Sequence, residues 1–251
     1  MSGHSKWANI KHRKGAQDAK RAKVFARLIR ELTIAARHGG GDPAANPRLR
    51  AAVTGARANN VPNDTVDKAI KRGTGEIDGT IIEEITYEGY GPGGVAVIVE
   101  CATDNKNRTT AEVRHVFTKY SGNLGANGCV SFIFDRKGQI RLDGGPADLD
   151  RVMEAAIEAG AEDVEADDGG ITVTTAMGDL HAVGEALRAG GLEVVEAELA
   201  MVPTTYVKVA ESEALGLMKM LTHMDDLDDV TRVSANFDID DELMARIEEK
   251  L

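Results

Sequence analysis

The sequence predicts a helical N-terminal domain followed by two small α+β domains with antiparallel sheets and helices on one face. Three observations support this fold class. Apolar residues recur at helical spacing to about residue 72, and beyond Gly79 the period changes to the alternation of half-buried strands. Strand-like and helix-like segments then follow one another to the end of a chain of 251 residues, which is long enough for two or three modest domains.

Three helical patterns occupy the N-terminal region. The segment from Asp18 to His38 places seven apolar residues on one stripe: Ala22, Phe25, Leu28, Ile29, Leu32, Ala35 and Ala36. The sequence GGGDP at 39–43 ends this helix. Pro47 suits the first turn of a second helix that runs to about Asn59, and a third spans about Asn63 to Arg72, with Gly73 as its cap.

Strands and helices alternate in the rest of the chain. We expect strands at Ile82–Glu88 and Val95–Cys101, joined by the turn GYGPGG, and a hairpin in which Phe132–Phe134 and Gln139–Leu142 flank the turn Asp135–Gly138. Further helices are expected near Arg108–Lys119, Ala147–Ala159, Gly178–Ala189 and Glu211–Leu221 and from Asp240, and further strands at Ile171–Thr175, Glu193–Leu199, Thr205–Val209 and Val230–Asn236. If the first strands pair with the last, the middle domain is inserted into the other.

The charge of the chain is divided unevenly along its length. The formal net charge is −11, yet residues 1–72 hold 16 Lys and Arg against 5 Asp and Glu, a net +11. The remaining residues hold 14 basic and 36 acidic groups, a net −22. Such asymmetry suggests a polyanion-binding end, although charged surfaces can also serve only to keep a protein in solution.

The positive charge is ordered in space. A basic arm near the N-terminus gathers Lys6, Lys11, His12, Arg13 and Lys14 around Trp7. On the helix that follows, a basic arc lies opposite the apolar stripe, with Glu31 the only acidic residue near it; it consists of Lys20, Lys23, Arg27, Arg30 and Arg37. We predict that arm and arc together form a surface that binds nucleic-acid phosphates, the alternative for the arc being a plain solvated face.

Two features bear on what such a surface would recognise. Trp7 either stacks on an exposed base, a contact worth about 1–3 kcal/mol, or anchors the arm to the helical domain. The sequence shows no recognition-helix signature and no Asn or Gln pair placed to read adenine edges, so strong base-specific recognition is not expected.

Motifs of catalysis and metal binding are scarce. G-x-S-x-G, HExxH, Walker A and CxxC patterns do not occur, so we predict no catalytic residue, cofactor or metal site. Cys101 and Cys129 lack metal-ligand spacing and suit a reducing compartment. An acidic run near the C-terminus lacks the glycine of a calcium loop and is expected to be a solvated turn; it comprises Asp225, Asp226, Asp228 and Asp229.

One polar segment is a candidate anion site. The sequence TDNKNRT at 103–109 joins a strand to the start of a helix, where free N–H groups and the helix dipole favour an anion. Lys106 and Arg108 could assist there. Capping of the helix alone would also explain the Asn and Asp residues.

Four motifs in order resemble one family. MSGHSKWANIKHRK at the start, KRGTGE at 71–76, YEGYGPGGVAVIVE at 87–100 and TDNKNRT at 103–109 closely resemble the YebC/PmpR family, and the resemblance spans essentially the whole chain. It implies a helical domain at 1–78, an α+β domain at 79–130 plus 202–251, and a third α+β domain at 131–201 inserted into the second. It also implies a non-enzymatic, cytoplasmic nucleic-acid-binding protein.

Two functions follow from these expectations. In the first, which the resemblance implies, the protein acts on the ribosome as a translation factor that helps synthesis through proline-rich stretches, with ribosomal RNA as its ligand. In the second, it is a DNA-binding transcriptional regulator. The sequence contains no apolar stretch of the ~18 residues that would cross a bilayer, and a monomer is the favoured oligomeric state.

Overall fold

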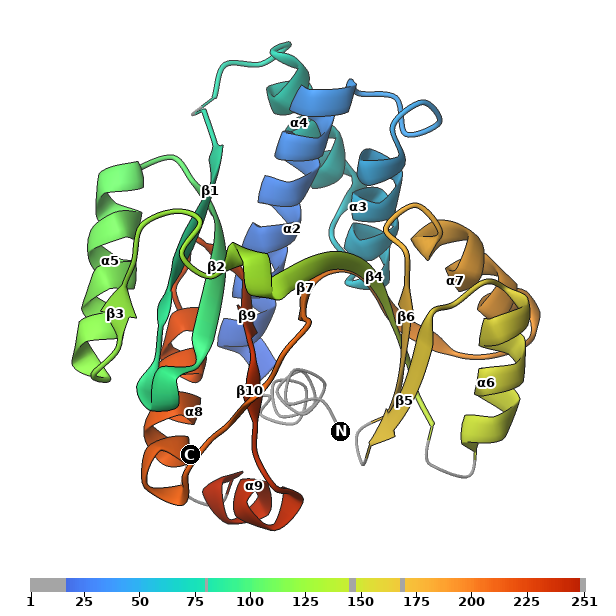
Figure 1. The fold of residues 1–251 in the computed structure, drawn as a ribbon. Coiled ribbons are helices and arrows are strands. Elements are labelled where there is room, and N and C mark those ends of the chain that lie inside the picture. The colour runs from blue at the N-terminus through green and yellow to red at the C-terminus, as the bar shows by residue number, and fades with distance from the viewer. Residues whose placement is uncertain (1–16, 80, 145–147, 168–169, 249–251) are drawn as a thin grey trace.

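The computed structural model describes residues 17–79, 81–144, 148–167 and 170–248 (Figure 1). Three α-helices come first: α2 (Gln17–Gly39), α3 (Pro47–Ala58) and α4 (Asn63–Thr74). Asn46 caps α3 by accepting a hydrogen bond from the Leu49 N–H. Gly75 ends α4 in the left-handed conformation at φ 80°, so the expectation of Gly73 as the cap is wrong: Gly73 lies inside α4, where a Cβ would be 2.4 Å from the Thr33 carbonyl oxygen. The three helices share one apolar core, which includes Leu32, Leu49 and Val66 and confirms the predicted stripe from Phe25 to Ala36; the side chain of Ala22 lies outside what the structure describes.

Sheet β3-β1-β2-β9 forms the centre of the first α+β domain. Its strands are antiparallel and comprise β1 (Glu83–Tyr90), β2 (Ala96–Thr103), β3 (Asn123–Leu124) and β9 (Val230–Ala235). Alternate residues of β2 point to opposite faces: Val97 and Val99 pack with α5 (Lys106–Lys119) and α8 (Glu211–Asp225), whereas Ile98 faces a smaller cluster. Because β9 pairs with β2, segments distant in sequence build one sheet, and the intervening domain is inserted.

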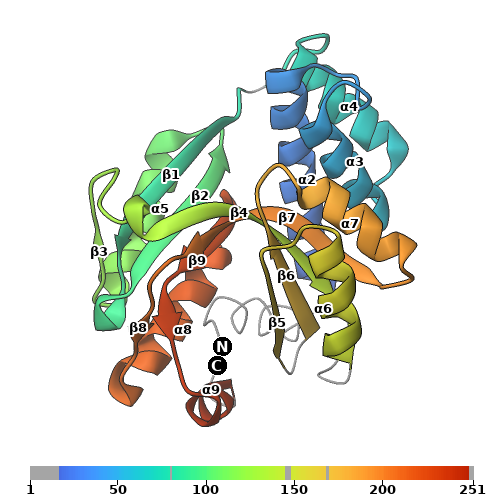
Figure 2. The same cartoon turned by 45° about the vertical axis from the view of Figure 1, so that its right-hand side comes forward.

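The inserted domain contains a second antiparallel sheet, in the order β5-β6-β4-β7. Its strands are β4 (Phe134–Leu142), β5 (Asp163–Asp167), β6 (Gly170–Thr175) and β7 (Val194–Pro203). Helices α6 (Leu149–Glu158) and α7 (Leu180–Ala189) cover one face of it (Figure 2). The fold class therefore agrees with the sequence prediction, whereas the residue numbers of the domain boundaries stay a prediction.

Strands β4 and β7 connect the two α+β domains. They pair from Phe134 opposite Pro203 to Leu142 opposite Val194, and they run between the two domains in Figure 2. At one end Phe134 packs against Ala96 and Ile98 of β2, and at the other end Leu142 belongs to the core of the inserted domain. A paired two-stranded connection resists rotation better than two single strands would.

The chain ends with short elements beside the first sheet. Strands β8 (Val207–Lys208) and β10 (Phe237–Asp238) pair in parallel, and α9 (Asp241–Glu248) follows them. Two short 3-10 turns, η1 (Pro92–Gly94) and η2 (Ser131–Ile133), complete the described elements. Among the described residues no helix has the length and apolar character needed to span a bilayer.

The expected hairpin around Asp135–Gly138 is wrong. These residues lie inside the continuous strand β4, where Gly138 pairs with Thr175 on one side and Leu199 on the other. A Cβ at Gly138 would lie 2.3 Å from the Thr175 hydroxyl oxygen, so the glycine permits close packing and does not form a turn. Strand β5 was not expected, because its acidic sequence DVEAD has low strand propensity.

We expect limited digestion with thermolysin to cut first, within the described part of the chain, near Ile77 and Ile81, between α4 and β1. Both side chains are exposed and lie outside helices and strands. The rest of the chain should persist as one fragment, because β4 and β7 join the two α+β domains. Mass spectrometry of the fragments measures this, and early cleavage near Phe132 or Pro203 into separately folded pieces would contradict the nested arrangement.

Candidate nucleic-acid interface

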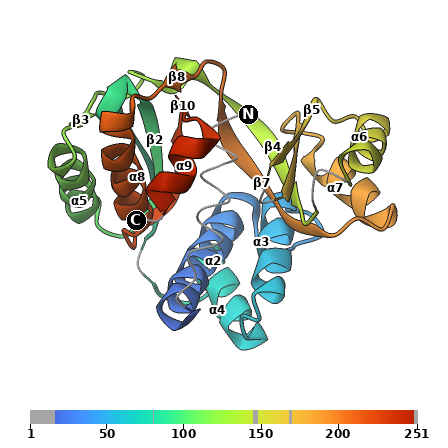
Figure 3. The ribbon, with the colours of Figure 1, turned by 90° about the horizontal axis from the view of Figure 1, so that it is seen from below.

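Three cations of the basic arc on α2 contact an acidic loop, which we define as residues 225–229, from the last residue of α8 to the residue before β9 (Figure 3). Lys23, Arg27 and Arg30 lie one helical turn apart on α2. The Lys23 ammonium donates to the Asp225 carbonyl oxygen and lies 3.5 Å from the Asp226 carboxylate. Arg27 donates to the Asp225 carbonyl oxygen at 2.6 Å and to its carboxylate at 3.2 Å.

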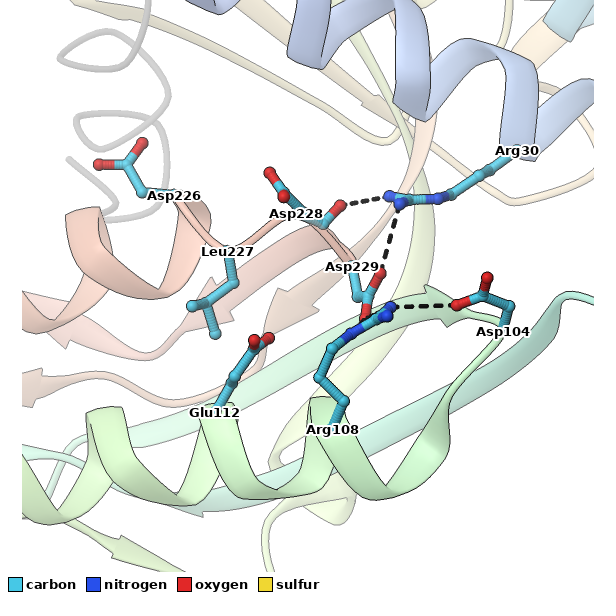
Figure 4. A pocket seen from close by; sticks show the side chains of 8 residues that line it. All are labelled: Arg30, Asp104, Arg108, Glu112, Asp226, Leu227, Asp228 and Asp229. Atoms are coloured by element: carbon cyan, nitrogen blue, oxygen red, sulfur yellow. Dashed lines mark hydrogen bonds and ion pairs between the residues drawn. The ribbon is translucent and has the colours of Figure 1, made fainter.

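Arg30 completes this contact at the far end of the loop. Its guanidinium donates to the Asp228 carbonyl oxygen and lies 3.3 Å from the Asp229 carboxylate (Figure 4). The side chains of Lys23, Arg27 and Arg30 are only 19, 17 and 22% exposed. In this structure, these three cations are therefore bound within the chain.

Asp229 is the most buried acid of the loop, at 1% exposure, and it accepts several hydrogen bonds. The hydroxyls of Thr103 and Thr109 donate to Oδ2 at 3.0 and 2.7 Å, and Arg108 donates to it at 2.7 Å. Burial by itself would raise the pKa of Asp229, but the hydrogen bonds from Arg108, Thr109 and Thr103 outweigh it and hold the pKa below its ordinary value. The loop is thus fastened to sheet and helix by an ionised carboxylate.

A polar cavity of about 480 Å³ opens between the loop and α5. Five carboxylates and two guanidiniums line it together with Leu227: Asp104, Glu112, Asp226, Asp228, Asp229, Arg30 and Arg108 (Figure 4). With this excess of negative charge the cavity repels phosphate as it stands. Among the described residues no cluster of His, Cys, Asp and Glu is arranged to hold a metal ion.

The candidate anion site at residues 103–109 has a partner within the chain. Arg108 is bound by Asp229 and, at 3.1 Å, by Asp104, while the Asn105 side chain caps α5 by accepting from the Arg108 N–H. Lys106 is exposed at the start of the helix. The carboxylate of Asp229 thus occupies Arg108, and the binding of an external anion there remains a prediction.

Several predicted residues of the interface are not described by the structure. The whole basic arm lies outside the described residues: Lys6, Trp7, Lys11, His12, Arg13 and Lys14. Lys20 lies on α2, but its side chain is not described. Arg37 is exposed at the other end of the helix and donates to the Ile82 carbonyl oxygen at 2.9 Å.

The expectation of a solvated acidic turn is wrong for Asp225 and Asp229, whose side chains are 15% and 1% exposed, whereas Asp226 and Asp228 are exposed. Asp229 is buried, and the loop is the surface on which α2 docks. One signal in the sequence pointed to this role. Carboxylates at the C-terminal end of a helix oppose its dipole, so an acidic run directly after α8 is favoured only where cations lie opposite it.

The helical domain carries further cations that the sequence analysis did not single out. Arg48 joins this domain to β1 through the carboxylates of Glu31 and Glu84, at 2.7 and 2.6 Å. Hydrogen bonding from Arg48 holds the pKa of Glu84 below its ordinary value. Exposed on α3 and α4 are Arg50, Arg57, Lys68, Lys71 and Arg72.

Exposed aromatic side chains gather around the turn at residues 129–133. Phe132 is 75% exposed, and Tyr90, which is 38% exposed, donates from its hydroxyl to the Cys129 carbonyl oxygen. The buried Glu88 carboxylate accepts hydrogen bonds from the backbone N–H groups of residues 128, 130 and 131 at 2.8–2.9 Å and fixes the turn. Sequence analysis did not find this surface, because periodicity does not show which apolar residues remain uncovered.

Comparisons with known proteins cover nearly the whole chain. Residues 5–76 match the TACO1/YebC protein N-terminal domain, and residues 82–237 match the TACO1/YebC second and third domain. A probable transcriptional regulatory protein of Magnetococcus marinus is 56% identical over 97% of this chain and 98% of its own length. One of Idiomarina loihiensis is 54% identical over 99% of this chain and its own full length.

The fold has a solved counterpart. The crystal structure of a conserved hypothetical protein from Aquifex aeolicus superposes with a TM-score of 0.85 at 46% identity, covering 91% of this chain and 95% of that one. The two family matches together include both the helical domain and the α+β domains described above. The chain belongs to the TACO1/YebC family.

Proposed function

We propose that this chain is a non-enzymatic, nucleic-acid-binding regulator of gene expression that acts on the ribosome as a translation factor and helps synthesis through proline-rich stretches. The observation that carries the proposal is the net charge of +11 in residues 1–72 beside −22 in the rest of the chain. Lys and Arg side chains at the basic end would neutralise phosphates. The acidic domains would be repelled by a long duplex lying across them, so the footprint is one-ended.

A transcriptional regulator is the second candidate, favoured by the names of the curated relatives. Such a protein must distinguish its site from ~10⁶ or more competing positions, which requires base contacts or DNA shape readout. In the helical domain, two side-chain amides of a type that can contact base edges are hydrogen-bonded to backbone carbonyl oxygens. Asn46 bonds the carbonyl oxygens of Ala35 and Gly40, and Asn59 bonds that of Gly55.

RNA recognition fits the arrangement better. Folded RNA is recognised by shape and by unstacked bases that lie against aromatic rings, without a long search among similar sites. We propose a cytoplasmic monomer whose basic arm, with Lys20 and Arg37 of the arc, binds ribosomal RNA.

Co-sedimentation with ribosomes is expected at ~150 mM salt, where exposed charges more than a Debye length of ~8 Å apart are largely screened. Purified protein is layered with ribosomes on a sucrose gradient, with and without an excess of random-sequence duplex DNA. The protein should remain with the ribosomes in the presence of the competitor. Cells without it should show ribosomes stalled on proline-rich sequences. Tight, sequence-selective duplex binding with no ribosomal association would decide for the transcriptional regulator.

A further inference from the structure

The partners of Lys23, Arg27 and Arg30 resemble a nucleic-acid backbone in their chemistry. Each cation binds carbonyl or carboxylate oxygens of the acidic loop. Phosphate oxygens are acceptors of the same kind and could replace them. Phosphates cannot approach these cations while the loop is in place, since the three side chains are at most 22% exposed. Binding to one partner therefore excludes the other.

The position of the acidic loop at the C-terminal end of α8 is electrostatically unfavourable for that helix. Asp225 lies in the last turn of α8 and Asp226 is its C-cap, where the helix dipole disfavours negative charge. The α2 cations offset this unfavourable placement. If these cations left the loop, the two carboxylates would remain in the unfavourable field of the helix dipole without an offsetting positive charge. The contact therefore stabilises the docked position of α2, and a competing polyanion has to offer the cations stronger contacts than the loop does.

The contact also has the character of a separable interface. The helical domain and the first α+β domain have distinct apolar cores. Polar contacts join the two domains: those of the acidic loop, the Arg48–Glu84 pair and the hydrogen bond from Arg37 to the Ile82 carbonyl oxygen. Ionic interfaces between domains weaken with salt and permit relative motion more readily than apolar ones.

We propose that the acidic loop is an intrachain competitor for the nucleic-acid backbone: Asp225 and Asp226 occupy Lys23 and Arg27, and phosphodiester groups displace the loop when the helical domain binds nucleic acid. This inference rests on the proposed function and adds to it a regulation of the same site. The three cations add to binding only after α2 has left the loop. The basic arm makes the first contact, and the displacement of the loop limits the affinity.

Removing the competing carboxylates should strengthen binding. In the variant D225N/D226N, the affinity for a labelled RNA stem-loop is expected to rise about fivefold or more, the lower end of typical coupling between two sites. The matched control is E154Q/E158Q, which removes the same charge from exposed positions on α6, in the inserted domain (Figure 1). It should change the affinity less than about twofold, because its field at α2 is screened.

A second measurement uses the unaltered chain. A carbodiimide joins a lysine amine to a carboxylate in contact with it, forming an amide while the carboxylate oxygen leaves on the reagent. The Lys23–Asp226 pair at 3.5 Å should form this crosslink in the free protein, and saturating RNA should suppress it. The Lys137–Glu162 pair, 2.9 Å apart in the inserted domain, is the internal control and should crosslink equally with and without RNA.

The results separate this inference from the proposed function. If the unaltered protein binds neither the RNA nor ribosomes, the proposed function fails and the inference fails with it. If it binds, but the Lys23–Asp226 crosslink forms at the same yield in saturating RNA, the inference alone is overturned. An affinity gain in D225N/D226N no larger than that of E154Q/E158Q would also overturn it.

Discussion

Reversing the charge of the basic arm, with Lys6, Lys11, Arg13 and Lys14 each changed to Glu, is expected to abolish nucleic-acid binding. If the unaltered protein neutralises ~5 phosphates, the logarithm of its binding constant should fall with the logarithm of salt concentration at a slope near −4. Replacing attraction by repulsion at four of these contacts removes the first step of binding, because three of the five arc cations, Lys23, Arg27 and Arg30, are held by the acidic loop.

The fold should not depend on these four side chains. The core of the helical domain is built from residues of α2, α3 and α4, so the thermal midpoint of unfolding should stay nearly unchanged. A matched control reverses four exposed cations of the α+β domains: Arg114, Lys119, Lys208 and Lys219. Fluorescence anisotropy over a salt series measures both variants. Undiminished affinity in the arm variant, or an equal loss in the control, would refute the assignment of binding to the arm.

The helical domain could be predicted from sequence because its signals are local. An apolar stripe at helical spacing and Pro47 at the start of a helix are contained in short segments, and the structure has the corresponding helices. The end of α4 was misplaced by two residues, because only the packing of Gly73 against α2 distinguishes it from Gly75, the actual cap. Asn46 adds a capping bond that fixes the start of α3. In the same way, the alternation of apolar and polar residues predicted β1 and β2, which pair with each other. Strand β9, also predicted, pairs with the free edge of β2.

The candidate site could not be predicted in the same way, because its contacts join residues about 200 positions apart. The arc cations were expected to form an open, phosphate-binding surface, since Glu31 is the only acid near them in sequence. Their partners Asp225 and Asp229 follow α8, and only the folded sheet brings that loop beside α2. The hairpin around Gly138 was predicted wrongly for a different reason. A glycine that permits close packing within a strand has the same local sequence pattern as a glycine in a turn.

Replacing Asp229 with Ala is expected to lower the free energy of unfolding of the first α+β domain by about 3 kcal/mol, the range found when one partner of a buried ion pair is removed. The change removes the carboxylate to which the hydroxyls of Thr103 and Thr109 donate and leaves Arg108 without its closest carboxylate. The matched control is D228A in the same loop. The Asp228 side chain is exposed and its contact to Arg30 uses the backbone carbonyl oxygen, so the effect should stay within ~0.5 kcal/mol.

The effect of D229A should also depend on pH in a defined direction. The pKa of Asp229 in the folded protein lies below its ordinary value of 3.8, so the ionised carboxylate stabilises the fold fully above that value. The stabilisation is lost as pH falls through the lower, folded-state pKa, because the protonated acid binds Arg108 and Arg30 weakly. Denaturant unfolding at pH 7 and near pH 3 should therefore show a smaller difference between D229A and the unaltered chain in acid. An equal difference at both values would mean that the hydrogen bonds of Asp229, and not its charge, fasten the loop. In that case the loop would keep its place after losing its negative charge, and its hold on α2 would rest on the carbonyl oxygens of Asp225 and Asp228.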